Sequence, residues 1–260
     1  MSPLLSIVLL AVVQGLTEFL PVSSSGHLEI LRAVTGLEGD PVTLEVALHL
    51  GTFLAVLFFF RKRILDLLGQ AWKGEGRGRT WILAVVVGSI PAGLVGVLFK
   101  DWFEQVFQSL LVVAVCLGLT GLGLLLLGGP PKGETRKVPG LFQSLLVGIA
   151  QALAILPGIS RSGSTIVTGL RTGMDRRTAG EFSFFLSLPA VGGAVLLKAL
   201  HMGETRNPLG YMAVGVLVSA VVGYLSLGFL MWILDKGRLR VFGPWCLAAS
   251  ALAFYLYLAG

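Results

Sequence analysis

Six apolar stretches, each about 20 residues long, constrain the fold of this chain more than any other feature of its sequence. They cover roughly residues 44–60, 81–99, 108–127, 181–200, 211–233 and 242–259. A helix of about 20 apolar residues crosses a hydrocarbon core of about 30 Å. Charged residues make up only 13% of the chain, about half the share found in soluble domains, so a soluble protein could not cover this much apolar surface. The sequence therefore predicts an all-α integral membrane protein.

Two further apolar regions are interrupted by polar residues near their centres. Residues 3–34 break at LPVSSSGH, and residues 140–171 break at LPGISRSGST. In each region a glutamine precedes a proline, which is followed by a serine-rich loop with a glycine and then a short apolar segment. Each half is about half a span long, so we expect two re-entrant helical hairpins. Irregular backbone at membrane depth must be buried in protein or line a wet cavity.

Three full spans follow each hairpin, so the chain reads as two copies of one unit. The predicted fold is a single transmembrane domain over residues 1–260, with six transmembrane helices plus two re-entrant helical hairpins. The repeats cover approximately 1–127 and 140–260, joined by a linker at 128–139. A hairpin leaves the chain on the side where it entered, whereas three spans reverse the side. The second unit is therefore inverted relative to the first, a common plan among transporters.

The basic residues agree with this arrangement. The net charge is +6, and most lysines and arginines lie in four expected connections: the loop 61–80, the linker 128–139, the connection at 171–177 and the loop 235–240. The predicted topology puts all four segments on one side, which the positive-inside rule makes cytoplasmic. The positive charge thus reflects topology and contact with anionic lipids, and does not indicate a nucleic-acid partner. The first hairpin enters from outside, the second from inside, and we expect their tips to meet near the midplane.

The first hairpin concentrates polar side chains at membrane depth, where burial of polar groups costs free energy. Gln14 and Glu18 are four residues apart and share one face of the incoming helix. The loop that follows carries three hydroxyls: Ser23, Ser24 and Ser25. Serine is a preferred residue at the start of a helix, and His27 lies in the first turn of the outgoing helix. Intramembrane ionisable residues are costly and mark functional sites by default, which applies to Glu18 and His27. For Glu45 and His49, near one end of the first span, the sequence does not distinguish a site role from an interfacial position.

The second hairpin repeats the plan with a cation in place of the carboxylate. Gly158 follows Pro157 where the incoming helix breaks, and Arg161 is expected in the loop. The remaining polar or small residues of the loop are Ser160, Ser162, Gly163 and Thr165. Two helix N-termini, a guanidinium and several hydroxyls in one place form an anion site suited to phosphate. A soluble phosphate-binding loop is excluded because no G-K-[ST] motif or preceding strand is present.

The two loops together resemble a known family. EFLPVSSSGHL with LPGISRSGSTI resembles the paired signatures of the bacterial undecaprenyl-diphosphate phosphatase family, of the bacitracin-resistance type. Gln14 and Glu18 fill the first motif. The second motif is filled by Pro157, Gly158, Ser160, Arg161, Ser162 and Thr165. Many family members carry a glutamate where this chain has Gln14, so Glu18 is left as the principal acidic residue and the expected metal ligand.

The resemblance implies an activity and its setting. The expected reaction is hydrolysis of undecaprenyl diphosphate to undecaprenyl phosphate and inorganic phosphate, which recycles the lipid carrier for peptidoglycan synthesis and gives bacitracin resistance. The chemistry is expected on the outward-facing side of the bacterial cytoplasmic membrane, with a divalent cation, Mg²⁺ or Ca²⁺. The expected partners are the polyprenyl diphosphate substrate and membrane lipids, with no nucleic acid. The oligomeric state stays open, a homodimer included.

The expected catalytic residues are Glu18, Ser24, His27 and Arg161. Ser24 is the leading nucleophile, with Glu18 and His27 as base and acid in an order that the sequence does not settle. A water activated by Glu18 or His27, and His27 itself as nucleophile, are the alternatives. The expected substrate-binding residues are Gln14, Ser23, Ser25, Gly158, Ser160, Ser162, Gly163 and Thr165. The rival function is a lipid-carrier flippase or transporter with an anion site at the midplane, because opposed hairpins also build alternating-access sites.

Overall fold

The computed structural model describes residues 3–35, 41–99, 102–103, 106, 109–129, 135–200 and 209–259. These residues are almost entirely helical, apart from turns, loops and an isolated bridge between Arg136 and Met174. The helices of the first half are α1 (Pro3–Thr17), α2 (Ser24–Thr35), α3 (Pro41–Trp72), α4 (Gly76–Leu98) and α6 (Leu110–Leu127). Those of the second half are α7 (Leu141–Leu153), α8 (Arg161–Arg171), α9 (Arg176–Leu200), α10 (Leu209–Asp235), the short 3-10 helix η1 (Leu239–Phe242) and α11 (Gly243–Ala259). Part of the predicted linker, 130–134, lies outside the described residues.

Five helical segments in the described residues are long and apolar enough to cross a membrane. They lie at Gly76–Leu98, Leu110–Leu127, Arg176–Leu197, Gly210–Asp235 and Leu239–Ala259. The prediction of an all-α, multi-pass membrane protein is therefore confirmed, and five of the six predicted spans correspond to these segments. The remaining predicted span, 44–60, lies within α3, which is 32 residues long and not one of the five.

The segment at 61–80, predicted as a loop, is mostly helix. α3 continues to Trp72, and only the turn Lys73–Glu75 separates it from α4. Asp66 explains part of this extension, because it accepts hydrogen bonds from Arg63 Nη1 (3.3 Å) and Gln70 Nε2 (3.1 Å) across single helical turns. Such i,i+3 and i,i+4 pairs stabilise a helix after its apolar part has ended. The hydropathy pattern marks where the apolar residues stop, but the helix itself does not end there.

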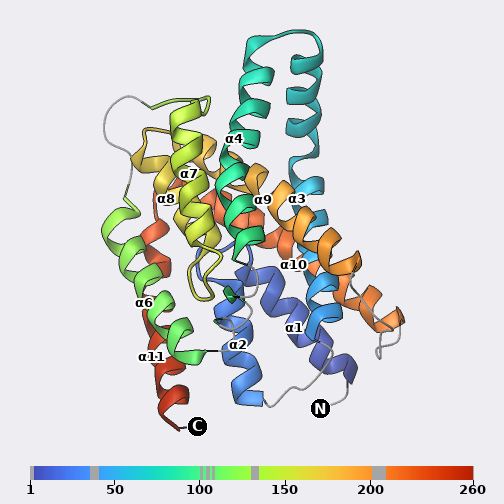
Figure 1. The fold of residues 1–260 in the computed structure, drawn as a ribbon, viewed down its shortest axis with the longest axis vertical. Helices are drawn as coiled ribbons and strands as arrows, with labels where there is room; N and C mark the ends of the chain where they lie inside the picture. Colours follow the sequence, from blue (N-terminus) through green and yellow to red (C-terminus); the bar gives the residue numbers. More distant parts are fainter. Residues whose placement is uncertain are drawn as a thin grey trace.

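The two broken regions lie in opposite halves of the molecule and touch at their loops. In Figure 1, α1 and α2 occupy the lower half, α7 and α8 occupy the upper half, and the loop within each pair lies toward the middle. A Cβ added to Gly26 would be 3.3 Å from the Cα of Gly158. Ser162 Oγ donates a hydrogen bond to the carbonyl oxygen of Leu20 (3.2 Å). The expected meeting of the two loops is therefore seen in these contacts.

Ion pairs and hydrogen bonds link the four basic segments, in part through the neighbouring residues Glu181 and Asp235. Arg63 Nε of α3 pairs with Glu181 Oε2 near the start of α9 (3.1 Å). Arg176, the first residue of α9, donates to the carbonyl oxygen of Asp235 at the end of α10 (2.9 Å). The linker joins the turn between α8 and α9 through backbone hydrogen bonds on both sides of Arg136. The start of α1 and the end of α11 lie at the opposite end of the molecule (Figure 1).

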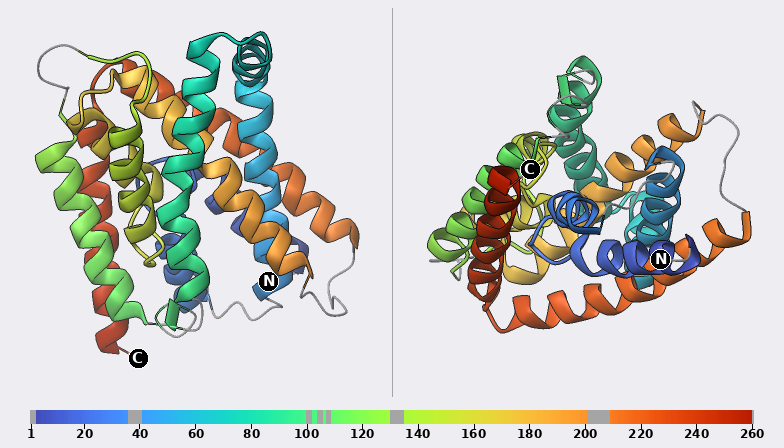
Figure 2. Two further views of the ribbon diagram at one scale, coloured as in Figure 1. Left: turned by 45° about the horizontal axis from the view of Figure 1, so that its top comes forward. Right: turned by 90° about the horizontal axis from the view of Figure 1, so that it is seen from below.

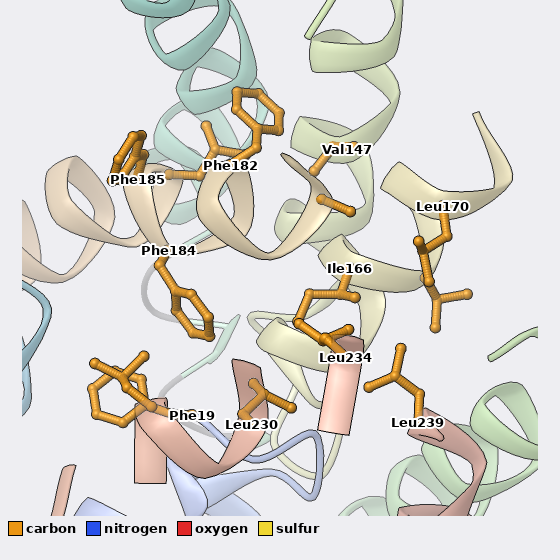
Figure 3. Close-up of a cluster of buried hydrophobic side chains, with 14 of the residues drawn as sticks. Phe19, Val147, Ile166, Leu170, Phe182, Phe184, Phe185, Leu230, Leu234 and Leu239 are labelled. Carbon is orange, nitrogen blue, oxygen red and sulfur yellow. The ribbon is translucent and has the colours of Figure 1, made fainter. Parts of the chain in front are cut away.

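Packing of the outer helices holds the loops in place. α6 runs alongside α11, and α10 runs along α3 and α1 (Figure 2). At the centre, the ring of Phe19 meets the ring of Phe184 of α9 edge-on, with centroids 5.8 Å apart (Figure 3). Phe19 also lies against α10, where a Cβ at Gly223 would come within 2.7 Å of its ring. Because Phe19 directly follows Glu18, this apolar contact fixes the backbone that carries the carboxylate.

Candidate functional site

The carboxylate of Glu18 joins the two loops. Glu18 follows the last residue of α1 and is 8% exposed. Its Oε1 forms an ion pair with Nη2 of Arg161 from the second loop. Its Oε2 accepts hydrogen bonds from Ser24 Oγ (2.6 Å) and Gln14 Nε2 (3.1 Å). Three predicted site residues, Arg161, Ser24 and Gln14, are thus brought together around the side chain of a fourth, Glu18.

The local backbone explains how Ser24 reaches Glu18. Ser23 has a φ of +69°, a left-handed conformation that reverses the chain between α1 and α2. A non-glycine residue in this region pays about 1 kcal/mol or more, and such strain persists only where the surroundings enforce it. Ser23 Oγ also accepts from the backbone N–H of Gly26 (3.4 Å), which caps α2. Ser24 is therefore the first residue of α2, with its hydroxyl on Glu18.

The second loop is built on the same pattern. Ser160 Oγ accepts from the backbone N–H of Gly163 (3.0 Å) and lies 3.3 Å from Ser162 Oγ. In the first loop, Ser23 Oγ makes the corresponding contacts with Gly26 N (3.4 Å) and Ser25 Oγ (3.3 Å). The residue between the two serines is Ser24 in one loop and Arg161 in the other. In both loops the two outer serines thus contact each other, and the first of them also caps the following helix. The middle residue, Ser24 or Arg161, contacts Glu18.

Arg161 was expected in the loop but is the first residue of α8. The Ser160 cap explains the difference, because it satisfies an N–H group of the first turn and lets the helix begin directly after it. The guanidinium is thereby attached to a helix, which limits its freedom more than a loop would. Its partner Glu18 comes from 143 positions earlier in the chain.

Two predicted substrate-binding residues, Gly158 and Thr165, hold the second loop in place and make no hydrogen bond to Glu18 within the described residues. Gly158 has a φ of +95°, and a Cβ there would lie 2.6 Å from the carbonyl oxygen of Val113 on α6. Thr165 Oγ1 donates to the carbonyl oxygen of Arg161 (2.8 Å) and lies 2.5 Å from Ser183 Oγ on α9. These contacts make Gly158 a close-approach turn and Thr165 a link between α8 and α9.

His27 lies in the first turn of α2, as expected, with both ring nitrogens engaged. Nδ1 is 2.8 Å from the carbonyl oxygen of Ser23. Nε2 accepts a hydrogen bond from Nε1 of Trp245 on α11 (2.8 Å). Among the described residues, no hydrogen bond joins the imidazole to Ser24 or Glu18, so the ring is held by the first loop and by α11. His49 of α3 interacts electrostatically with Glu18, whereas the side chain of Glu45 lies outside the described residues.

Sequence reasoning missed Thr120 and Trp245. Thr120 Oγ1 donates to the carbonyl oxygen of Gly158 (3.0 Å) and accepts from the backbone N–H of Ser160 (3.1 Å). It is the one hydroxyl in the otherwise apolar helix α6, and that isolation is a signal that could have found it. Trp245 begins an apolar span and reads as an ordinary interfacial aromatic. Its pairing with His27 carries no sequence signal.

Two buried polar atoms of the site have no hydrogen-bond partner among the described residues. They are Nη1 of Arg161 and Oε1 of Gln14. An unsatisfied buried donor or acceptor costs about 1–3 kcal/mol, and more when the group is charged. A phosphate oxygen would satisfy the guanidinium N–H group, since arginine binds phosphate through two parallel hydrogen bonds. The amide oxygen of Gln14 is an acceptor of the kind that hard cations prefer.

The donor set fits a divalent cation only with help from a ligand. Among the described residues, no group of three or more His, Cys, Asp and Glu side chains lies together. The Glu18 carboxylate and Ser24 Oγ form a cluster with one formal negative charge, and Gln14 joins it through Nε2 while its Oε1 is buried without a partner among the described residues. Mg²⁺ is usually held by one or two carboxylates together with substrate phosphates. These residues therefore fit an ion shared with a bound diphosphate.

Comparisons with known proteins match the chain over almost its whole length. The family model described as bacitracin resistance protein BacA matches residues 7–252. A protein of Moorella thermoacetica named undecaprenyl-diphosphatase is 42% identical over 254 residues, covering 95% of each chain. Proteins of the same name from Halothermothrix orenii and Rhodopirellula baltica are each 40% identical. The first match covers 92% of this chain and 93% of the relative, and the second covers 99% and 100%.

Proposed function

Because the chain belongs to the bacitracin resistance protein BacA family, we infer that it is an undecaprenyl-diphosphatase. It hydrolyses undecaprenyl diphosphate to undecaprenyl phosphate and inorganic phosphate. This reaction regenerates the lipid carrier of cell-wall synthesis, and bacitracin resistance follows from the family. The observation that carries the chemical assignment is the contact of Glu18, Ser24 and Arg161, from two separate loops, in one buried cluster.

In the proposed ground state, Arg161 binds the terminal phosphate of the substrate. Its free Nη1 supports this role, because the group is buried and lacks an acceptor. The phosphate competes with Glu18 for the guanidinium and leaves the carboxylate freer to accept a proton. N–H groups at the starts of α2 and α8 add donors toward the same anion. The guanidinium and these N–H groups also stabilise charge on the phosphoryl group during transfer, which is the main source of catalysis in such reactions.

We assign the nucleophile to Ser24. Its Oγ attacks the terminal phosphorus, the anhydride P–O bond breaks, and undecaprenyl phosphate leaves. The Ser24 proton passes to Glu18 Oε2, which already accepts the hydroxyl hydrogen bond at 2.6 Å. Water then attacks the phosphoserine, the O–P bond to Ser24 breaks, and inorganic phosphate is released while Glu18 returns the proton to the serine oxygen. The first step needs a base within hydrogen-bond reach of the nucleophile, and Glu18 meets this requirement.

The alternatives are weaker on geometry. His27 as nucleophile would need its Nε2 in direct contact with the phosphorus, whereas the ring nitrogens contact Ser23 and Trp245, and no hydrogen bond among the described residues joins the ring to the Glu18 carboxylate. Direct attack by a water activated by Glu18 leaves no role for the Ser24 hydroxyl that occupies Glu18 Oε2. Trapping and mapping a phosphorylated serine distinguishes the covalent route from the direct one.

We further propose that a divalent cation, Mg²⁺ or Ca²⁺, binds with the substrate. Glu18 and Gln14 Oε1 would hold it together with phosphate oxygens. When bound, the ion supplies positive charge that neutralises the diphosphate. Gln14 contributes a neutral oxygen where a glutamate would contribute a charged one, so Glu18 carries the acidic role alone.

We propose the finer topology of six transmembrane helices and two re-entrant hairpins, arranged as an inverted repeat over about 1–127 and 140–260. Two observations support this topology. The two serine loops have matching hydrogen bonds, and they approach each other from opposite halves of the molecule (Figure 1). The clustering of the basic segments at the end away from the termini supports a cytoplasmic location for that end. The site of the first hairpin then opens toward the outer face of the bacterial cytoplasmic membrane.

The test is phosphate release from undecaprenyl diphosphate by the purified protein in detergent, with magnesium or calcium titrated. The detergent format leaves no membrane to cross, so any turnover reflects hydrolysis and not lipid transport. Release that depends on Glu18, Ser24 and Arg161 supports the assignment. A properly inserted protein that releases no phosphate at any metal concentration would refute it.

A further inference from the structure

In the described part of the chain, Trp245 is the one aromatic side chain that forms a hydrogen bond with a catalytic candidate. Its indole Nε1–H lies 2.8 Å from Nε2 of His27. The two ring planes differ by 3° and their centroids are 6.1 Å apart. This separation is too large for face-to-face contact of the rings, so they meet edge to edge. The indole N–H therefore points along the direction of the imidazole lone pair.

The two partners of His27 determine its protonation and tautomer. An indole N–H can only donate, so Nε2 must carry a lone pair. A backbone carbonyl can only accept, so Nδ1, at 2.8 Å from the oxygen of Ser23, must carry the proton. The imidazole is therefore neutral, in the Nδ1–H form, with its orientation fixed from both sides. Such a ring offers its Nε2 lone pair as a base.

Trp245 gains little from packing inside the protein. The residue is 59% exposed, whereas Trp81, the tryptophan of the core, is 1% exposed. The next residue, Cys246, is buried and lies 3.5 Å from the carbonyl oxygen of Pro21, so this turn of α11 lies directly against the first loop. The indole is thus held beside the site on a firm base, while its own ring is largely free of protein contacts.

We propose that Trp245 is a positioning residue of the reaction, which keeps His27 neutral and oriented so that Nε2 accepts a proton from the water that hydrolyses the phosphoserine. This inference rests on the proposed site, in which Glu18 serves Ser24 and leaves His27 for the second step. The water takes the place of the indole N–H at Nε2, the O–H proton moves to Nε2, and the water oxygen forms the new bond to phosphorus. The serine oxygen is released as that bond forms and takes back the proton that Glu18 Oε2 received in the first step. The indole N–H returns to Nε2 once the proton has left.

The test replaces the donor and keeps an aromatic ring. Trp245→Phe is expected to lower kcat by about 3- to 10-fold, the equivalent of one net hydrogen bond, with KM within about twofold. Trp232→Phe is the matched control, since this indole of α10 is 51% exposed and stacks on Phe229. The control is expected to leave both constants unchanged. Wild-type kcat in Trp245→Phe would overturn the proposal, because loss of the indole N–H would then have no effect on the reaction. A Trp245→Phe protein that fails to fold while Trp232→Phe folds would also overturn it, because that result indicates a packing role.

Coupling and spectroscopy separate positioning from general structural support. In a His27→Gln background, Trp245→Phe is expected to cause no further loss of kcat, because the indole acts through His27. The chain has three histidines, and ¹⁵N signals absent from His27→Gln identify those of His27. We expect a protonated Nδ1 and a hydrogen-bonded Nε2 that shifts toward the position of a free imine nitrogen in Trp245→Phe. A protonated Nε2 in the wild type, or an unchanged Nε2 signal in the variant, would contradict the proposal.

A parallel assay of Ser24→Ala distinguishes failure of the proposed active site from failure of the proposed role of Trp245. Normal turnover of Ser24→Ala refutes the proposed site, and the Trp245 inference falls with it. An inactive Ser24→Ala together with wild-type kinetics of Trp245→Phe refutes only the role of Trp245.

Discussion

The ion pair between Glu18 and Arg161 predicts an unequal pair of stability losses. Their side chains are 7% and 15% exposed, so removal of either charge leaves the other in a poorly solvated place. Loss of one partner of a buried pair costs about 3–5 kcal/mol. In Arg161→Gln, Glu18 keeps its donors Ser24 and Gln14, which puts this variant near the lower end. In Glu18→Gln, the guanidinium loses its charged partner while Nη1 already has none, which puts this variant near the upper end.

The assay is thermal unfolding of the purified variants in one detergent at one pH. For a chain of this size, 1 kcal/mol corresponds to about 2–4 °C, so Tm is expected to fall by about 6–12 °C in Arg161→Gln and by about 10–20 °C in Glu18→Gln. The double variant is expected to lose about 3 kcal/mol less than the sum of the single losses, since it buries no lone charge. The control is Asp66→Asn, which breaks a pair with 53% of Asp66 exposed and is expected to cost about 0–1 kcal/mol. Single losses below about 1 kcal/mol, or losses that simply add, would refute the account of the pair.

Three further predictions concern the loops and the metal. Gly158→Ala should destabilise the protein strongly and abolish turnover, because the added Cβ would lie 2.6 Å from a carbonyl oxygen of α6. The control is Gly173→Ala, which has a similar φ of +94° and nothing within 4 Å of the added Cβ. This control should lose only about 1 kcal/mol of stability and keep activity. Equal unfolding midpoints of these two variants would contradict this. Thr120→Val should cost about 1–3 kcal/mol and reduce kcat, because it leaves two backbone groups of the second loop unpaired, whereas Thr80→Val, on a largely exposed helix turn, should leave kcat unchanged; a matching loss in both would remove Thr120 from the account. Gln14→Glu should lower the metal concentration for half-maximal phosphate release severalfold, since a second carboxylate adds a charged ligand, and an unchanged metal titration would argue against metal binding at this position.

The core of the candidate site could be predicted from the sequence because its residues are expensive in an apolar chain. Glu18 and Arg161 stand out for this reason, and the proline and serine patterns place both at breaks between short helices. Approach of the two loops followed from the count of spans, because each hairpin leaves the chain on its original side. These inferences depend on the chemistry of neighbouring residues and on the number of membrane crossings, and both can be read from the sequence.

Other features depend on packing between distant residues and could not be read in this way. His27 and Trp245 are separated by 218 positions, and nothing in the sequence around Trp245 indicates which ring it faces. The motif names Thr165 and Gly158 but gives no direction for either, and both hold the loop in place through α9 and α6. The prediction that the helix of α3 ends near residue 60 was wrong, because α3 continues to Trp72. Hydropathy reports where the apolar residues end, whereas i,i+4 pairing of polar side chains extends the helix beyond that point.

The central claim is that the two loops form one diphosphate site in which Ser24 is the nucleophile. The most direct measurement is rapid-quench labelling with undecaprenyl diphosphate carrying a radioactive terminal phosphate, applied to the wild type, Ser24→Ala and Ser25→Ala. Ser25 is the matched control, because its Oγ lies by Ser23 and not by Glu18. We predict label on Ser24 in the wild type, retained label and turnover in Ser25→Ala, and neither in a properly inserted Ser24→Ala. Near-normal phosphate release from Ser24→Ala would contradict the account.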